Sequence, residues 1–278
     1  MRWLLLVSLL VLTLVRVPPA AGPLNNTDAS IHRSEGAKLR GRVDRAARLI
    51  DEGHRRDGLE TIGQLLHHLR VLRDSDSGAT SLDVETIDTI ARELLTLRND
   101  ALLEAWPFPA NFRGEFLSSV LGAATWGDWA LDVPTSITLV QAVLESNWGR
   151  NAPGNALFGM KGTGTAGSLQ RRVVEYRGSQ RSRPVHSFRS YHNIGESIAD
   201  HARLLSQSRR YAHARAVAED PDAYARALQG VYASDPRYAQ KLSAMTRSLD
   251  LLRFDVPGAA PYRPIEHVAP RDKPAPAG

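Results

Sequence analysis

One carboxylate, Glu145, stands near the end of a short apolar segment that follows Pro134 and stops before Gly149. A proline before a helix and a glycine after it are typical boundary signals, so we expect a helix between them. Gln141, Glu145 and Trp148 recur at helical spacing, which predicts an acid beside an indole. An acid against a large apolar ring loses hydration, and its pKa rises as a general acid at neutral pH requires.

The alternative interpretation of Glu145 is a solvated charge at a helix end. The segment that follows weighs against it, because residues 155–162 read Asn-Ala-Leu-Phe-Gly-Met-Lys-Gly. Glycines, an amide and an aromatic ring directly after an acid suit the wall of a glycan-binding cleft better than core packing. We therefore predict that Glu145 is catalytic.

The order of residue types over 141–161 is more specific than a lone glutamate. Gln-Ala-x-Leu-Glu-Ser-x-Trp-Gly, followed by Asn-x-Leu-Phe-Gly-Met-Lys, resembles the core motif of the bacterial glucosaminidase family, glycoside hydrolase family 73. That family includes the Bax-like proteins and the muramidase-like domain of flagellar rod-assembly proteins. The resemblance covers about residues 120–253. It implies a lysozyme-like α+β fold, mostly α with a small β-hairpin, with peptidoglycan as substrate and Glu145 as the acid.

The resemblance also assigns roles to positions further along the chain. A second carboxylate on the family's hairpin matches Glu175, although Bax-like members carry no obvious counterpart and an exposed strand charge is the alternative. Residues 230–239 resemble the family's Gly-Tyr-Ala-Thr-Asp-Pro-x-Tyr-Ala, with Val231 where glycine is usual. Tyr232 matches a tyrosine of the family's active site, and a half-buried core tyrosine is the alternative. We expect the substrate to contact Gln141, Trp148, Asn155, Phe158 and Lys161.

The predicted reaction is endo-type hydrolysis of a β-1,4 bond of the glycan strand, on the reducing side of N-acetylglucosamine. Glu145 would protonate the leaving oxygen. Either Glu175 activates a water on the opposite face, or the substrate's own 2-acetamido group attacks. Tyr232 would position that group or steady the charged transition state. Hydrolysis of this kind implies no metal and no organic cofactor.

Two other function classes remain open from the sequence. A lytic transglycosylase or muramidase would act on the same polymer, and a transglycosylase would leave 1,6-anhydro sugar ends. A non-catalytic wall-binding or assembly protein would keep the fold and release no fragments. The presence of Glu145, Tyr232 and the Asn-x-Leu-Phe-Gly loop argues against the binding protein.

Residues 1–22 have the pattern of a secretory signal peptide: one early arginine, an apolar run over 3–15 and small residues near position 20. The run is short for a membrane span, which takes about 20 residues. An uncleaved anchor is the alternative and would be the only membrane contact. In either case we predict export to the periplasm or cell envelope.

The charge balance points to an anionic partner. The chain has a formal charge of +5 and a pI near 9.7, which suits an anionic cell-wall polymer. Its basic residues alternate with acids, so we predict no nucleic-acid partner. The sequence has no cysteine, which excludes disulfides and thiolate metal sites. His67 and His68 would point about 100° apart on a helix, so we predict no metal there.

The chain divides into four predicted segments: the signal at 1–22, a helical extension at 23–105, a catalytic domain at 106–256, and a disordered Pro/Ala-rich tail at 257–278. Within the extension, 23–33 is polar and predicted disordered, and three amphipathic helices follow. In the catalytic domain we expect a helix over 112–124, Trp126 and Trp129 in the core or against sugar rings, and two strands, 168–176 and 184–191. Every residue with a proposed role follows Trp106, so residues 107–256 are expected to fold and hydrolyse alone.

Overall fold

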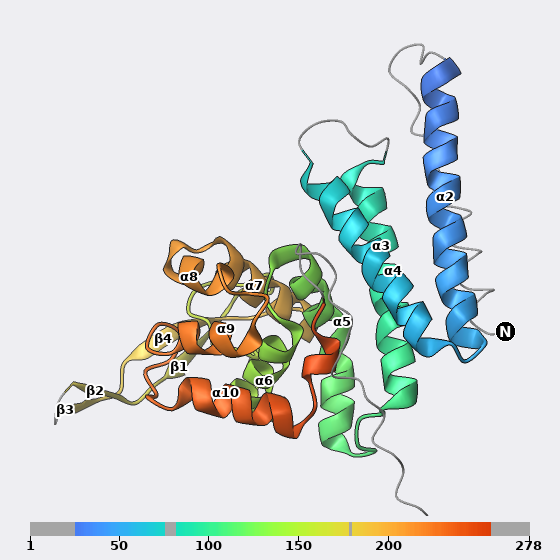
Figure 1. The fold of residues 1–278 in the computed structure, drawn as a ribbon. Helices are drawn as coiled ribbons and strands as arrows, with labels where there is room; N and C mark the ends of the chain where they lie inside the picture. The colour runs from blue at the N-terminus through green and yellow to red at the C-terminus, as the bar shows by residue number, and fades with distance from the viewer. Residues whose placement is uncertain (1–25, 76–81, 178–179, 257–278) are drawn as a thin grey trace, which may run out of the picture.

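The computed structural model describes residues 26–75, 82–177 and 180–256 of the 278-residue chain. The predicted signal segment and the predicted tail lie outside the described residues. The described part is mostly α-helical with a small antiparallel β region, as predicted (Figure 1). In that part, no helix has both the length and the apolar character needed to span a bilayer.

Three helices form the N-terminal extension: α2 (Asn26–Asp51), α3 (Arg55–Asp74) and α4 (Val84–Ala105). The prediction of disorder over 23–33 is wrong from Asn26 onward, because no proline interrupts the segment and the amphipathic helix extends into it. A Cβ at Gly58 would lie 2.6 Å from Ile50 Cγ1, so the glycine lets α3 approach α2 closely. Asp83 caps α4, because its side chain accepts a hydrogen bond from the Thr86 amide at 2.6 Å.

Helix α5 (Phe112–Leu131) extends past its predicted end at Ala124. Gly127 does not break it, and a Cβ there would lie 3.1 Å from the Ala202 Cβ. Trp126 and Trp129 therefore both lie within α5, and both face the extension. Trp129 is buried and donates its Nε1 to the Leu66 carbonyl at 2.9 Å, and the Arg92 guanidinium lies 3.4 Å from the Trp126 ring centroid. These contacts are those of core packing rather than sugar stacking.

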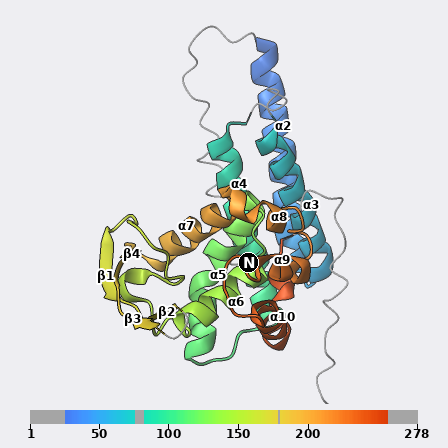
Figure 2. The same cartoon turned by 90° about the vertical axis from the view of Figure 1, so that its left-hand side faces the viewer.

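Helix α6 (Thr135–Ser146) follows Pro134, where the sequence predicted a helix start. It packs against α5, α9 (Pro221–Leu228) and α10 (Tyr238–Ser248). Its residues are buried almost continuously from Thr135 to Val143. Figure 2 shows the β region on one side of α5 and α6, with α9 and α10 on the other. Helix α6 is therefore at the centre of the predicted catalytic domain, residues 106–256, which we call the catalytic half.

Two short ladders replace the two long predicted strands. β1 (Ser168–Arg172) pairs with β4 (Val185–Arg189), and β2 (Glu175–Arg177) pairs with β3 (Gln180–Ser182), both antiparallel. The two ladders are separated at Pro184, which has no N–H to donate. Its carbonyl accepts a hydrogen bond from the Val173 amide. The β2–β3 pair lies at the end of the molecule opposite the extension (Figure 1).

The remaining described elements close the catalytic half around α6. They are η1 (Pro153–Asn155), α7 (Ile194–Gln207), η2 (Arg209–Tyr211), α8 (Ala212–Arg215) and η3 (Leu252–Phe254). α7 packs along α5, and η3 contacts both α4 and α6. The chain thus returns from its far end to the junction between the extension and the catalytic helix.

Buried polar contacts join the extension to the catalytic half. Arg98 of α4 is 1% exposed, and its guanidinium donates to the carbonyls of Arg253, Phe254 and Asp255 at 2.8–3.0 Å. Arg70 of α3 donates to the Asp128 carbonyl at 3.1 Å. Helix α4 ends beside the predicted boundary at Trp106, yet one continuous apolar core runs through both parts.

Candidate active site

Two carboxyl groups, that of the buried Asp128 and that of the half-buried Asp255, hold the N-terminus of α6. Asp128 Oδ2 accepts hydrogen bonds from Thr135 N and Oγ1, both at 2.8 Å, and from Val256 N at 2.9 Å. Asp255 accepts from Ser136 N at 2.6 Å and from Ser136 Oγ at 2.8 Å. Carboxyl groups there satisfy amides that have no partner within the helix. α6 is thus fixed at the end opposite Glu145.

Burial disfavours charge on both of these carboxyl groups. Burial raises the pKa of Asp128 to about 6, although the hydrogen bonds that Asp128 accepts lower it in part. Burial, followed by the nearby Asp128 charge, raises the pKa of Asp255 to about 8. The folded protein therefore keeps a proton on this pair near neutral pH.

Glu145 lies in the last turn of α6 and borders a small hollow between the helix and the β1–β4 ladder. The other residues that line this hollow are Asn151, Pro153, Ala156, Gly159, Leu169, Arg171 and Phe188. The glutamate side chain is exposed toward the hollow, while the surrounding protein removes part of its hydration. This loss of hydration raises the pKa of Glu145, and a hydrogen bond from Tyr238 lowers it in part.

Tyr238 is the site residue that the sequence reasoning missed. Its hydroxyl donates to Glu145 Oε1 at 3.1 Å and accepts from Gln141 Nε2 at 3.0 Å. Burial of the ring, followed by the Glu145 charge, raises the pKa of Tyr238, so the hydroxyl stays protonated and able to donate. The signal available was its place in the same motif as Tyr232, at the first position of α10.

The Tyr232 ring packs on the Tyr238 ring. The two rings stack with centroids 5.8 Å apart and an interplanar angle of 20°. The Tyr232 and His201 rings meet edge-to-face with their centroids 5.7 Å apart, and burial raises the pKa of the Tyr232 hydroxyl. The geometry makes Tyr232 a support for the tyrosine that contacts the acid, and its direct contact with substrate stays a prediction.

The predicted pairing of Glu145 with the Trp148 indole is wrong in its geometry. α6 ends at Ser146, and both Asn147 and Trp148 adopt left-handed backbone with φ of 50° and 60°. The chain therefore leaves the helical path before the indole, which packs edge-to-face on Phe116 at 6.4 Å. A Cβ at Gly149 would lie 2.9 Å from the Phe116 ring, so this turn requires glycine. Trp148 lines a separate surface groove with Phe112 and Phe116.

Three of the residues predicted to bind substrate make contacts within the protein, and their contact with substrate stays a prediction. Gln141 is fully buried under Tyr238. Phe158 is 6% exposed and stacks on the buried His201 ring at 3.8 Å. Asn155 has a left-handed φ of 57° and donates its Nδ2 to the Tyr191 carbonyl at 2.9 Å. The loop after α6 thus packs these side chains against the protein, while its residues Ala156 and Gly159 line the hollow beside Glu145.

Lys161 and Glu175 both belong to the β region. Lys161 is exposed, with its Nζ 3.4 Å from His186 Nε2. Glu175 is the first residue of β2 and pairs with Ser182 across the ladder. Its side chain lies outside the described part of the structure, so its role as a base stays a prediction.

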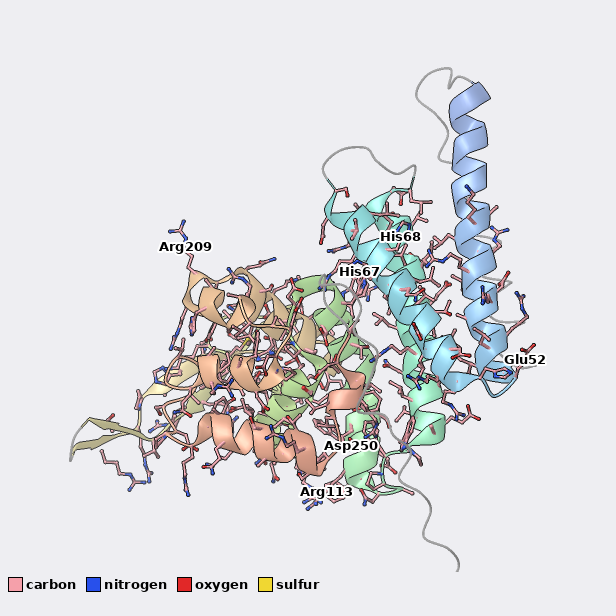
Figure 3. The ribbon with its side chains drawn as sticks, in the orientation of Figure 1. Glu52, His67, His68, Arg113, Arg209 and Asp250 are labelled. Atoms are coloured by element: carbon pink, nitrogen blue, oxygen red, sulfur yellow. The ribbon has the colours of Figure 1, made fainter. Side chains whose placement is uncertain are left out.

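Over the described ranges, no group of three or more His, Cys, Asp or Glu residues has an arrangement that would hold a metal ion. His67 and His68 both lie on α3 of the extension, away from the β region (Figure 3).

The family comparison covers the part of the chain that carries this site. Residues 128–251 match the Glucosaminidase family, described as mannosyl-glycoprotein endo-beta-N-acetylglucosaminidase. Peptidoglycan hydrolase FlgJ of Pseudomonas aeruginosa is 30% identical over 146 residues, which are 49% of this chain and 36% of that protein. Exo-glucosaminidase LytG of Bacillus subtilis is 32% identical over 148 residues, 50% of this chain and 52% of that protein. The chain thus spans about a third to a half of these curated relatives.

The alignment with one solved domain covers nearly all of that domain. The catalytic domain of the autolysin Auto from Listeria monocytogenes is 30% identical, and the alignment covers 58% of this chain and 97% of that domain, with a TM-score of 0.49. The family match contains α6 with Glu145, the β region, and α10 with Tyr238. Residues 128–251, which carry the candidate site, are therefore a domain of the Glucosaminidase family.

Proposed function

We propose that this protein is a peptidoglycan hydrolase that cleaves β-1,4 bonds of the glycan strand, on the reducing side of N-acetylglucosamine. The observation that carries the proposal is Glu145. It borders a hollow between α6 and the β1–β4 ladder, its pKa is raised by burial, and Tyr238 donates to it. These are the properties of a general acid poised at the rim of a cleft.

In the proposed reaction Glu145 gives its proton to the glycosidic oxygen as the bond from that oxygen to C1 breaks. One carboxyl oxygen carries this proton, and Oε1 accepts the Tyr238 hydrogen bond. That bond favours the carboxylate left after proton transfer, because hydrogen bonding to a charged form stabilises it. Tyr238 is therefore a positioning residue that acts through Glu145.

The second half of the reaction has two possible routes. Glu175 takes a proton from a water that attacks C1 on the opposite face, which inverts the sugar. Alternatively the substrate's 2-acetamido oxygen attacks C1, and water opens the resulting ring. The position of Glu175 at the start of β2 is compatible with a hairpin residue that approaches substrate from the side opposite α6.

The test is digestion of purified sacculi by wild type and by Glu145→Gln, with released fragments identified by mass spectrometry. The amide keeps the shape of the side chain and has no acidic proton, so release should fall by about a hundredfold or more. Glu115→Gln is the matched control, because Glu115 is an exposed glutamate of α5 in the separate groove. Fragments from Glu145→Gln at the wild-type rate would contradict the assignment.

The same digests separate the alternative classes. New reducing N-acetylglucosamine ends support the proposed bond, and reducing N-acetylmuramic acid ends would indicate a muramidase. Products with 1,6-anhydro ends would indicate a lytic transglycosylase. Binding to sacculi with no fragments from the wild type would indicate a wall-binding or assembly protein.

We also propose that residues 1–22 direct export and that the protein acts in the periplasm or cell envelope. Support comes from the pattern of one arginine, an apolar run and small residues. N-terminal sequencing of the protein from an envelope fraction tests this proposal. A mature N-terminus near residue 23 supports cleavage, and an intact Met1 in that fraction indicates an anchor.

A further inference from the structure

The β1–β4 ladder turns one defined face toward Glu145. Directly paired residues share a face of a ladder, and residues two apart return to it. Leu169 pairs with Phe188, and Arg171 pairs with His186. Leu169, Phe188 and Arg171 all line the hollow that Glu145 borders. The pairing therefore places His186 on this same face.

A lysine completes a group of three basic side chains at this place. The Lys161 backbone bridges to Phe188, which holds the lysine beside β4, and its Nζ lies 3.4 Å from His186 Nε2. We call Lys161, Arg171 and His186 the cationic cluster. Arg171 is exposed and has no ion-pair partner among the residues that the structure describes. Lysine and arginine are charged at neutral pH, so the cluster carries at least two positive charges.

The ligand that suits this cluster is a carboxylate. Guanidinium and carboxylate groups match as planar pairs with two parallel hydrogen bonds, and an ammonium adds a point charge. We propose that the cationic cluster binds a carboxylate carried by the glycan strand and so selects wall glycan over neutral polymers of N-acetylglucosamine. This inference rests on the proposed function, because it places the carboxylate on the substrate of Glu145.

Wall glycan carries carboxylates from two sources. Each muramic acid bears a lactyl ether, whose acid is either free or linked to a stem peptide that has carboxylates of its own. The cluster recognises the carboxylate chemistry that both sources share. Arg171 and Glu145 border one hollow, so a carboxylate held there keeps a neighbouring sugar close to the acid.

The experiment compares Arg171→Gln with Arg172→Gln in the full chain. Arg172 is the next residue of β1, is exposed, and points to the opposite face of the ladder, so it controls for net charge and for strand stability. Three soluble glycans are the substrates: peptide-bearing strands, strands stripped of peptide by an amidase, and peptide-bearing strands whose carboxyls are converted to neutral amides.

Arg171→Gln should lower kcat/KM about tenfold on peptide-bearing strands through KM, the size of effect expected from one charge-assisted hydrogen bond. It should match wild type on the neutralised strands, and Arg172→Gln should stay within about twofold of wild type on all three. A defect confined to peptide-bearing strands assigns the carboxylate to the stem peptide. A defect on stripped strands as well shows that the cluster also binds the lactyl carboxylate, because that acid is free only after the peptide is removed. Equal effects of the two variants, or an Arg171→Gln defect that persists on neutralised strands, would overturn the proposal.

Binding separates this inference from the proposed hydrolysis. The same two substitutions are placed in Glu145→Gln, and co-sedimentation with sacculi is measured at low and moderate salt. Weaker sedimentation with Arg171→Gln but not with Arg172→Gln supports the carboxylate site even if the wild type releases no fragments. Equal sedimentation of both would overturn the site while leaving the hydrolysis intact.

Discussion

Two opposing influences set the proton affinity of Glu145. Loss of hydration raises its pKa, and the hydrogen bond from Tyr238 lowers it. A general acid must be protonated before the reaction and must release its proton during it. Burial serves the first requirement and the tyrosine the second, so a change at Tyr238 should appear in the pH dependence of the rate.

Tyr238→Phe should move the basic limb of the kcat/KM profile to higher pH. The variant removes a hydrogen bond to the carboxylate, so the pKa of Glu145 rises further and the acid stays protonated to a higher pH. The phenyl ring keeps its stacking on Tyr232. Rates across pH 4–9 give the measurement.

Tyr211→Phe is the control for Tyr238→Phe. Tyr211 also contacts the Tyr232 ring, with centroids 6.3 Å apart, and lies further from the acid along the row of rings. The basic limb of the kcat/KM profile of Tyr211→Phe should match that of wild type. A purely structural role for Tyr238 would lower the rate at every pH and leave the limb in place.

Glu175→Gln decides between the two routes for the attacking group. If Glu175 is the base, turnover should fall by about a hundredfold or more, and azide should partly restore it as a glycosyl azide of inverted configuration. Steady-state rates and NMR of the azide product measure both effects. Turnover within a few-fold of wild type would assign the attack to the 2-acetamido group.

The order of residue types predicted the place of Glu145, but not which neighbours touch it. Helical spacing extended from Glu145 to Trp148 was misleading, because the left-handed turn at Asn147 redirects the chain. Tyr238 stands 93 residues from Glu145, and only the packing of α10 on α6 brings the two together. Local periodicity carries no information on such a contact.

At the scale of elements, the helices with regular apolar spacing were predictable and the ladder was not. α3 and α4 lie in the region where amphipathic helices were predicted, and α6 begins after Pro134 as predicted. The two strand-like runs carry the right composition but separate at Pro184, which has no N–H to pair. The helix predicted over 112–124 continues to Leu131 as α5, because Gly127 within it costs a helix interior only about 1 kcal/mol.

The caps of α6 make the stability of the fold depend on pH. The pKa of Asp255 is about 8 in the folded protein and near 3.9 when unfolded. Between these values the folded state binds more protons than the unfolded state. The free energy of unfolding therefore falls as the pH rises from about 4 to about 8.

Asp255→Asn should flatten this pH dependence. The amide oxygen accepts from Ser136 N, and its NH2 donates to Ser136 Oγ, so both contacts persist without a titrating group. Urea unfolding at pH 5, 6, 7 and 8 measures the slope. Asp74→Asn, at a side chain that is 64% exposed, should keep the wild-type slope. A slope unchanged in Asp255→Asn would show that other groups cause the dependence.

At the scale of the whole molecule, the extension completes the catalytic half. The Trp129 indole is covered by α3, and three carbonyls of η3 and the residue after it depend on Arg98. Asp255 belongs to this same segment and caps α6. The sequence showed that all candidate site residues follow Trp106, but it did not show that their support begins before it.

Arg98→Met should lower the free energy of unfolding by about 3 kcal/mol or more, because it leaves three buried carbonyls without their donor. Urea denaturation gives the value. Arg48→Met is the matched control at an exposed arginine of α2, and it should change stability by less than about 0.5 kcal/mol. Equal stability of the two variants would show that the Arg98 contacts contribute nothing.

Removal of residues 26–105 should be more damaging than any single substitution. The sequence alone predicted that residues 107–256 fold and hydrolyse independently, whereas the structure predicts a truncated protein with its Trp129 face uncovered and the segment around Asp255 unsupported. We expect a lower urea midpoint, binding of a hydrophobic dye, and weaker glycan hydrolysis. If the 107–256 fragment unfolds at the full-length urea midpoint and keeps the full-length rate on sacculi, the extension has no part in the catalytic core and its apolar contacts serve another purpose.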